Sequence, residues 1–204
     1  MQIAKTLSAL VVSSALMFSP VLGTTISLQP SPQTATLGNS VDLMLQIEGL
    51  GAGTAPSLGA FDLVINYTPS ILSFDSVTFG ADLGPVFGSW SDWSNDPSLG
   101  ILTLSDISLD SAFDLDSLQP GDFLMASLRF SAIGVGTSAV DITDPILADG
   151  NGDPLIPDAL LGANITVVDS QAVPESGPMA SGFILVVFAM LGAHWFQKSR
   201  RVTM

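Results

Sequence analysis

The chain has 204 residues, a formal net charge of −14 and no cysteine, which is enough for one ordinary domain with short terminal segments. All acidic residues lie between Asp42 and Glu175, where Arg129 is the one basic residue. This charge excludes nucleic acid and anionic lipid as partners of the central region, because both need Lys or Arg to neutralise phosphate. The lack of cysteine excludes disulfides, zinc–thiolate sites and thiol catalysis.

Residues 1–23 have the layout of a secretory signal peptide. Lys5 supplies the positive start, residues 7–18 are apolar, and Pro20 ends the apolar run. Val21 and Gly23 suit the positions before a cleavage site, so cleavage is expected after Gly23. The alternative is an N-terminal helix that is retained.

Residues 24–170 predict an all-β domain, an antiparallel β-sandwich. Apolar and polar side chains alternate in several short segments, as in strands with one buried face. Turns rich in Gly, Pro and Asp separate the segments at near-regular spacing, which favours a sandwich of about eight or nine strands. No convincing amphipathic helix is present in this region. The residues expected to face the core are Val41, Leu43, Leu45, Ile47, Phe61, Leu63, Ile65, Tyr67, Leu124, Ala126, Leu128, Phe130, Ile165 and Val167.

The central region contains no His, Cys or Lys. Catalytic triads, thiol nucleophiles and Schiff-base lysines are therefore excluded. Carboxylate chemistry remains, as in a secreted glycosidase with two acids ~5–10 Å apart. Acids are so frequent here that close pairs carry little information, and Asp114, Asp116 and Asp122 predict a solvated loop. We expect a protein that is not an enzyme, with the glycosidase as an alternative.

The segment 149–154, DGNGDP, has two interpretations. Asn151 and Gly152 suit the two positive-φ positions of a type I′ hairpin turn, which is the favoured one. An EF-hand is excluded because Pro154 and Leu160 stand where its loop needs Gly and Glu. No cofactor is expected except, as the weaker alternative, calcium at alternating oxygen ligands. The candidate calcium ligands are Asp144, Asp149, Asn151 and Asp153.

Residues 84–97 form a polar segment, expected to be a loop, with two tryptophans. Trp90 and Trp93 are candidate partner-binding residues, since tryptophan can stack on sugar rings or anchor a protein partner. Alternatively, one or both close the edge of the sandwich. If the segment is a strand, residues three apart point to opposite faces, so at most one of the two belongs to the core.

The last thirty residues predict a membrane-targeting tail. Residues 178–197 form an apolar segment long enough for a transmembrane helix, and the basic residues that follow predict a cytoplasmic end at 198–204. A linker at 171–177 separates this helix from the domain. The linker motif is Val173, Pro174 and Glu175, and the basic cluster is Lys198, Arg200 and Arg201.

This three-part tail resembles the PEP-CTERM sorting signal of bacteria, although Ser176 stands where that pattern usually has a second proline. The resemblance implies export, an inner-membrane anchor before processing, recognition by an exosortase-type enzyme and cleavage near the motif. The mature protein is then attached to the cell surface or released. A plain membrane anchor is the alternative.

Three segments of the central region resemble cohesin-like domains. They are residues 58–80, with Tyr67 and Pro69 in a Tyr-x-Pro pattern, residues 120–142, and the closing hairpin at 144–167. The resemblance implies a jelly-roll β-sandwich that binds a partner, a dockerin module in the best-known members. We therefore expect a non-catalytic surface or extracellular-matrix protein that binds a protein or a polysaccharide. A carbohydrate-binding module is a further alternative.

Overall fold

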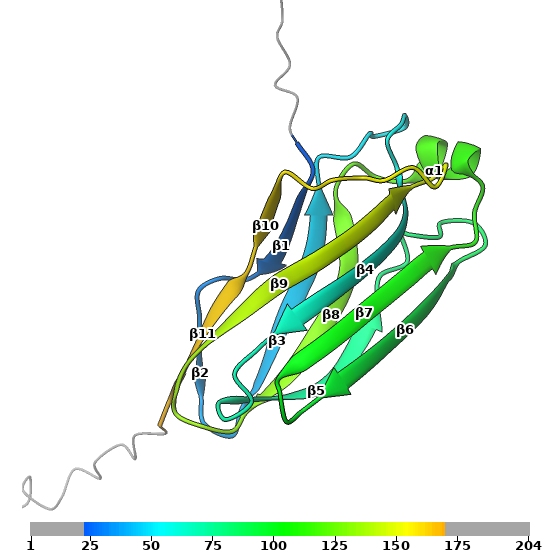
Figure 1. Cartoon of the computed structure of the whole chain (residues 1–204). Coiled ribbons are helices and arrows are strands. Elements are labelled where there is room, and N and C mark those ends of the chain that lie inside the picture. The colour runs from blue at the N-terminus through cyan, green and yellow to red at the C-terminus, as the bar shows by residue number, and fades with distance from the viewer. Residues whose placement is uncertain (1–22, 170–204) are drawn as a thin grey trace, which may run out of the picture. The chain divides into compact units, whose positions relative to one another are not determined.

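The computed structural model describes residues 23–169, which form two β-sheets packed as a sandwich (Figure 1). The predicted signal peptide, sorting motif, transmembrane segment and basic tail lie outside these residues. One sheet has five strands in the order β10-β1-β3-β8-β5. Its strands are β1 (Thr25–Gln29), β3 (Ser40–Glu48), β5 (Leu72–Phe79), β8 (Phe123–Ala132) and β10 (Ala159–Leu161).

The second sheet has six strands in the order β2-β11-β9-β4-β7-β6. Most neighbours are antiparallel, as predicted, but β1 pairs with β10 and β2 with β11 in parallel. The structure has eleven strands between residues 23 and 169, more than expected, because β2 and β10 are too short to show alternation. The strands of this sheet are β2 (Gln33–Thr36), β4 (Leu58–Asn66), β6 (Ser89–Asp96), β7 (Ile101–Ser108), β9 (Gly136–Asp149) and β11 (Ala163–Val168).

The core lies between the sheets and confirms the predicted alternation with one exception. Leu124 was expected to be buried, but it is only partly buried, and Phe123 and Met125 are buried instead. A β-bulge explains the difference, because the register between β3 and β8 shifts between Leu45 and Gln46. A bulge adds one residue to a strand and so exchanges the faces of the residues beyond it. Among the described residues, the strand pairings and the core lie within 25–168, so this segment contains what a domain needs to fold.

Four aromatic rings connect the two sheets along the side where β5 and β6 lie. Tyr67, at the end of β4, meets Phe130 of β8 at 5.3 Å between ring centroids, and Phe130 meets Phe74 of β5 at 5.7 Å. Phe74 then meets Trp93 of β6 at 5.4 Å. All three contacts are edge-to-face, a favoured geometry for aromatic pairs. The series joins the edge strands of the two sheets.

A short helix, α1 (Ala112–Leu118), follows β7 and corrects two expectations. No helix was predicted, and Asp114 and Asp116, which belong to α1, were assigned to a solvated loop. Ser111 is the N-cap, and its hydroxyl accepts a hydrogen bond from the backbone N–H of Asp114 at 3.2 Å. This Ser-x-x-Asp spacing is a helix-start signal that the sequence contained. Between residues 23 and 169, no helix is long and apolar enough to cross a membrane.

The buried side chain of Gln119 attaches α1 to the six-stranded sheet. Its Oε1 accepts a hydrogen bond from the backbone N–H of Leu58 at 2.6 Å, and its Nε2 donates to the carbonyl of Leu58 at 3.0 Å. Asp116 adds a second link, because it accepts a hydrogen bond from the Ser57 hydroxyl at 2.7 Å. The helix is thereby fixed beside the start of β4.

The two tryptophans of β6 should differ in their contribution to stability. We expect Trp93→Ala to lower the free energy of unfolding by about 1–2 kcal/mol, because it removes the contact with Phe74. Trp90→Ala, on the opposite face of the same strand, should change it by less than about 0.5 kcal/mol. Urea unfolding of residues 24–169 followed by circular dichroism measures both values. Equal losses would show that Trp93 does not close the edge.

Candidate functional site

A second β-bulge determines what the outer face of the six-stranded sheet displays. Val140 and Ile142 of β9 face the core, but the register between β4 and β9 then shifts opposite Leu63. Asp144, in the bulge, has a φ of 49°, and within residues 23–169 it is the one non-glycine residue with a positive φ. Beyond the bulge Leu147 is buried, whereas Ile146 is 70% exposed. The extra residue therefore turns Ile146 outward.

Two large side chains lie beside two small ones in a row across this outer face. Trp90 of β6 lies opposite Ile107 of β7, which lies opposite Ala60 of β4, which lies opposite Ala148 of β9. Trp90 is 65% exposed and Ile107 is 48% exposed. The two alanines leave a hollow of about 280 Å³ between these side chains and Ile146. An open apolar hollow on a surface is a common feature of binding sites.

A second hollow of about 270 Å³ continues from the first toward α1. The two share Ala60, Ile107 and Ala148 as lining residues, and we call them together the trough. The second hollow also includes Gly59, where a Cβ atom would lie 2.4 Å from the carbonyl oxygen of Asp149. A side chain at position 59 would therefore force β4 and β9 apart at this end.

Hydrogen bonds fix the backbone at the α1 end of the trough. Asp110 lines this end, and its carboxylate accepts from the backbone N–H groups of Val86 at 2.9 Å and Phe87 at 2.6 Å. The N–H of Leu109 donates to the carbonyl of Gly88 at 3.0 Å. Phe87 is largely exposed on this braced loop. The backbone at this end of the trough is thus pre-organised.

The turn at 149–153 also borders the trough, and it is not of type I′. The N–H of Gly152 donates to the carbonyl of Asp149 at 2.9 Å, and Gly152 has a φ of 85°. Asn151 does not have the positive φ that type I′ requires. The Asp149 carboxylate accepts from the N–H groups of Asn151 at 2.8 Å and Asp153 at 2.9 Å, so it stabilises a different tight turn.

The candidate calcium ligands lie in two different structural elements. Asp144 lies in the bulge of β9, whereas Asp149, Asn151 and Asp153 lie in or beside the turn. Within residues 23–169, no three acidic or histidine side chains are grouped as metal ligands would be. Calcium binding by these four residues stays a prediction.

The candidate partner-binding tryptophans lie on an edge strand, β6, and not in a loop. Trp90 lines the trough, whereas Trp93 is 48% exposed and packs against Phe74. One tryptophan therefore belongs to the outer face and the other to the edge of the sandwich. Their role in binding stays a prediction. The sorting motif Val173, Pro174 and Glu175 and the basic cluster Lys198, Arg200 and Arg201 lie outside the described residues.

Sequence reasoning missed the other trough residues. Ile107 stands at an outward position of β7, next to the inward Asp106, so an apolar residue out of phase was the available signal. Ile146 gave no such signal, because unbroken alternation along β9 would have placed it in the core. The small residues Ala60 and Ala148 can be assigned to the trough only when the pairing of β4 with β9 is known.

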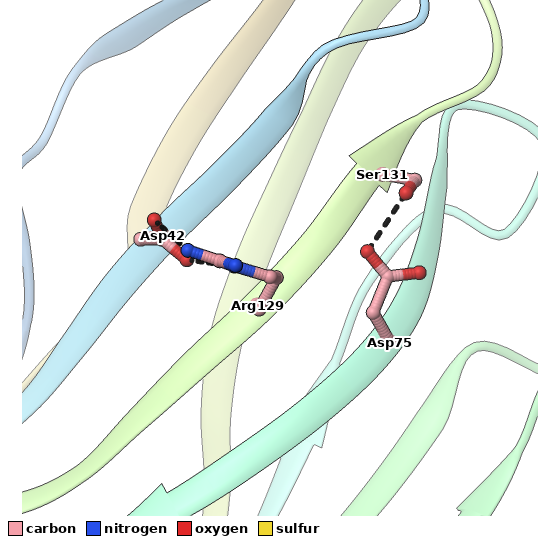
Figure 2. A network of polar contacts seen from close by, with 4 residues as sticks. All are labelled: Asp42, Asp75, Arg129 and Ser131. Carbon is pink, nitrogen blue, oxygen red and sulfur yellow. Dashed lines mark hydrogen bonds and ion pairs between the residues drawn. The ribbon is translucent and has the colours of Figure 1, made fainter.

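The single basic residue of the central region lies on the other sheet. Arg129 of β8 makes two hydrogen bonds to Asp42 of β3, from Nε at 2.7 Å and from Nη2 at 2.9 Å (Figure 2). These bonds lower the pKa of the Asp42 carboxyl below 3.8. Asp75, on β5, accepts a hydrogen bond from Ser131 at 2.7 Å (Figure 2). Both side chains of the ion pair are more than half exposed, so its contribution to stability is small.

Asp106 of β7 is a buried acid beneath the trough. Its Oδ2 accepts a hydrogen bond from the Ser89 hydroxyl at 3.1 Å, while Oδ1 is buried and has no partner. Burial raises the pKa of its carboxyl above 3.8, and the hydrogen bond from Ser89 offsets only part of this effect. Ionised Asp106 therefore destabilises the folded state.

Several solved structures with a similar fold are cohesin modules. A non-cellulosomal cohesin from Archaeoglobus fulgidus matches with a TM-score of 0.55 and 16% identity, over 74% of this chain and 94% of that chain. The fold is that of a cohesin module. A type I cohesin–dockerin complex from Clostridium thermocellum matches with a TM-score of 0.58 and 10% identity, over 72% of this chain and 100% of that one.

A cohesin module of a family 33 glycoside hydrolase from Clostridium perfringens also matches. Its TM-score is 0.55 at 12% identity, over 72% of this chain and 98% of that chain. No protein-family model and no curated protein sequence matches this chain. The cohesin-like fold predicted from residues 58–80, 120–142 and 144–167 is confirmed at the level of structure.

Asp106 and Asp42 should give opposite pH dependence. The raised pKa of Asp106 means that the folded state loses stability as the pH rises above about 3.8. As the pH rises from 3 to 7, the stability of Asp106→Asn relative to the wild type should therefore increase. Asp42, whose pKa is lowered, contributes stability that is lost as the pH falls, so Asp42→Asn should lose stability over the same interval. Urea unfolding at several pH values measures both trends, and trends of the same sign would contradict the assignment.

Proposed function

We propose that this chain is an exported, non-catalytic docking module that binds a partner protein through the trough. The observation that carries the proposal is the exposure of Trp90, Ile107 and Ile146 around a floor of alanine. Large exposed apolar residues on a braced surface are typical of protein interfaces, where a few such residues supply most of the binding energy.

The cohesin-like fold supports a docking role. Two of the similar structures are cohesin modules in complexes with dockerins from Clostridium thermocellum. The sequence identities of 10% and 14% limit the comparison to the fold, so the location of the site rests on the trough itself. The lack of His, Cys and Lys between residues 24 and 170 also favours binding over catalysis.

Binding through the trough can be tested by capture with matched variants. Immobilised residues 24–169 are exposed to the secreted fraction of the source cells, treated with protease or with glycan-degrading enzymes. We expect protease to abolish capture, and Ile107→Ser or Ile146→Ser to weaken it about tenfold, as for residues at the centre of an interface. Met44→Ser, an exposed apolar position on the five-stranded sheet, is the control and should have no effect. Capture that only glycan removal abolishes would support a polysaccharide ligand and reject the proposal.

We further propose that the terminal segments direct export and sorting. The apolar run after Lys5 and the tail from Val173 to Arg201 support this, because each has the three-part layout of its signal. The domain then operates on the cell surface or in the extracellular matrix, where a protein without cysteine needs no disulfide formation.

Processing should be visible at both ends of the mature protein. Mass spectrometry of protein from the cell surface and medium should find an N-terminus near Thr24 and a C-terminus near Glu175. Pro174→Ala combined with Glu175→Ala should leave the tail attached, because the sorting motif is lost. An intact tail on mature wild-type protein would instead indicate a plain membrane anchor.

A further inference from the structure

Every ionisable side chain that lines the trough is acidic. Asp62 and Asp106 line the first hollow, and Asp110 and Asp149 line the second. Asp106 is buried, which leaves the other three at the surface of the trough or along its margin. An apolar surface flanked by negative charges selects a partner by charge as well as by shape.

This negative charge has no counterpart within the central region. Arg129 is the one basic residue between 23 and 169, and it lies on the five-stranded sheet in a two-bond contact with Asp42 (Figure 2). The trough's own potential is therefore uncompensated. A second copy of this chain is disfavoured as the occupant, because all acidic residues except Glu175 lie in the same region.

Two of the acids are held in place by backbone groups. The carboxylate of Asp110 accepts two N–H groups from residues 86 and 87, and that of Asp149 accepts two from its own turn. Charges fixed in this way lose little conformational entropy when a partner binds. Between residues 23 and 169, no three such groups are clustered as ligands for one metal ion, so single cationic side chains spaced along the trough fit the arrangement better.

We propose that the trough binds a cationic segment of a partner protein, with aliphatic side chains over Ala60 and Ala148 and Lys or Arg beside Asp62, Asp110 and Asp149. This inference rests on the proposed docking function and adds the chemistry of the partner. Charge complementarity of this kind accelerates association and makes the affinity depend on salt, whereas stacking of a neutral sugar on Trp90 does not depend on charge.

The probes are three synthetic peptides of equal length, built from Leu and Lys, from Leu and Glu, and from Ser and Lys. They are titrated into ¹⁵N-labelled residues 24–169 at low and at high salt. The Leu–Lys peptide should shift the amide resonances of Ala60, Ile107 and Ala148 and the indole resonance of Trp90, and bind about tenfold more weakly at high salt. Equal binding of the Leu–Glu peptide, or shifts confined to other surfaces, would overturn the inference.

A pair of variants separates local charge from net charge. Asp62→Asn and Asp141→Asn remove the same charge from the same sheet, but Asp141 does not line either hollow. We expect Asp62→Asn to weaken binding of the Leu–Lys peptide about three- to fivefold, and Asp141→Asn to have less than half of that effect on the dissociation constant. Equal effects would show attraction to the whole surface and would overturn the inference. Circular dichroism confirms that both variants fold.

The same variants distinguish failure of this inference from failure of the docking function. If Ile107→Ser weakens capture of the secreted partner while Asp62→Asn and high salt do not, the docking function stands and the cationic partner is wrong. If Ile107→Ser leaves capture unchanged, the trough is not the docking site and both proposals fail.

Discussion

Four aromatic rings in edge-to-face contact hold the open side of the sandwich together. Tyr67 and Trp93 come from the six-stranded sheet, and Phe130 and Phe74 from the five-stranded sheet, so the series crosses between the sheets twice. The chain has no cysteine, so no disulfide can take over this task. The position of β6, and with it the trough, therefore depends on these contacts and on the apolar core beside them.

Charge repulsion opposes this fold. The acidic side chains repel one another, and only the exposed pair of Arg129 and Asp42 offsets this repulsion directly within residues 23–169. Several acids instead bond to backbone N–H groups, as Asp110 and Asp149 do. The carboxylates thus shape loops and turns locally, while their combined field remains available to an external partner. Asp106 is the exception, because its burial lowers stability and its carboxylate bonds to the Ser89 hydroxyl with Oδ1 left without a partner.

The sequence predicted the structure correctly where the order of apolar and polar residues within a single strand determines which side chains are buried. Alternation predicted the buried faces of β3, β4 and β11, since the period of a strand is visible in the residues themselves. It failed at Leu124, because a bulge adds a residue without a compositional signal. The helix α1 was missed because seven residues are too few for a helical period, although Ser111 and Asp114 carried a capping signal. The trough could not be predicted, because its residues come from four strands whose pairing across residues 58–149 the sequence did not show.

The bulge at Asp144 makes the exposed face depend on the backbone geometry of β9 and not only on the kinds of residues in the strand. If the same residues formed a regular strand without the bulge, unbroken alternation would move Ile146 and Ala148 toward the core and Leu147 toward solvent. In evolution, residue types along the trough can therefore change with the partner, while the bulge between Ile142 and Leu147 is constrained. Descendants of this domain should diverge by substitution on this face and tolerate insertions and deletions elsewhere, in the loops.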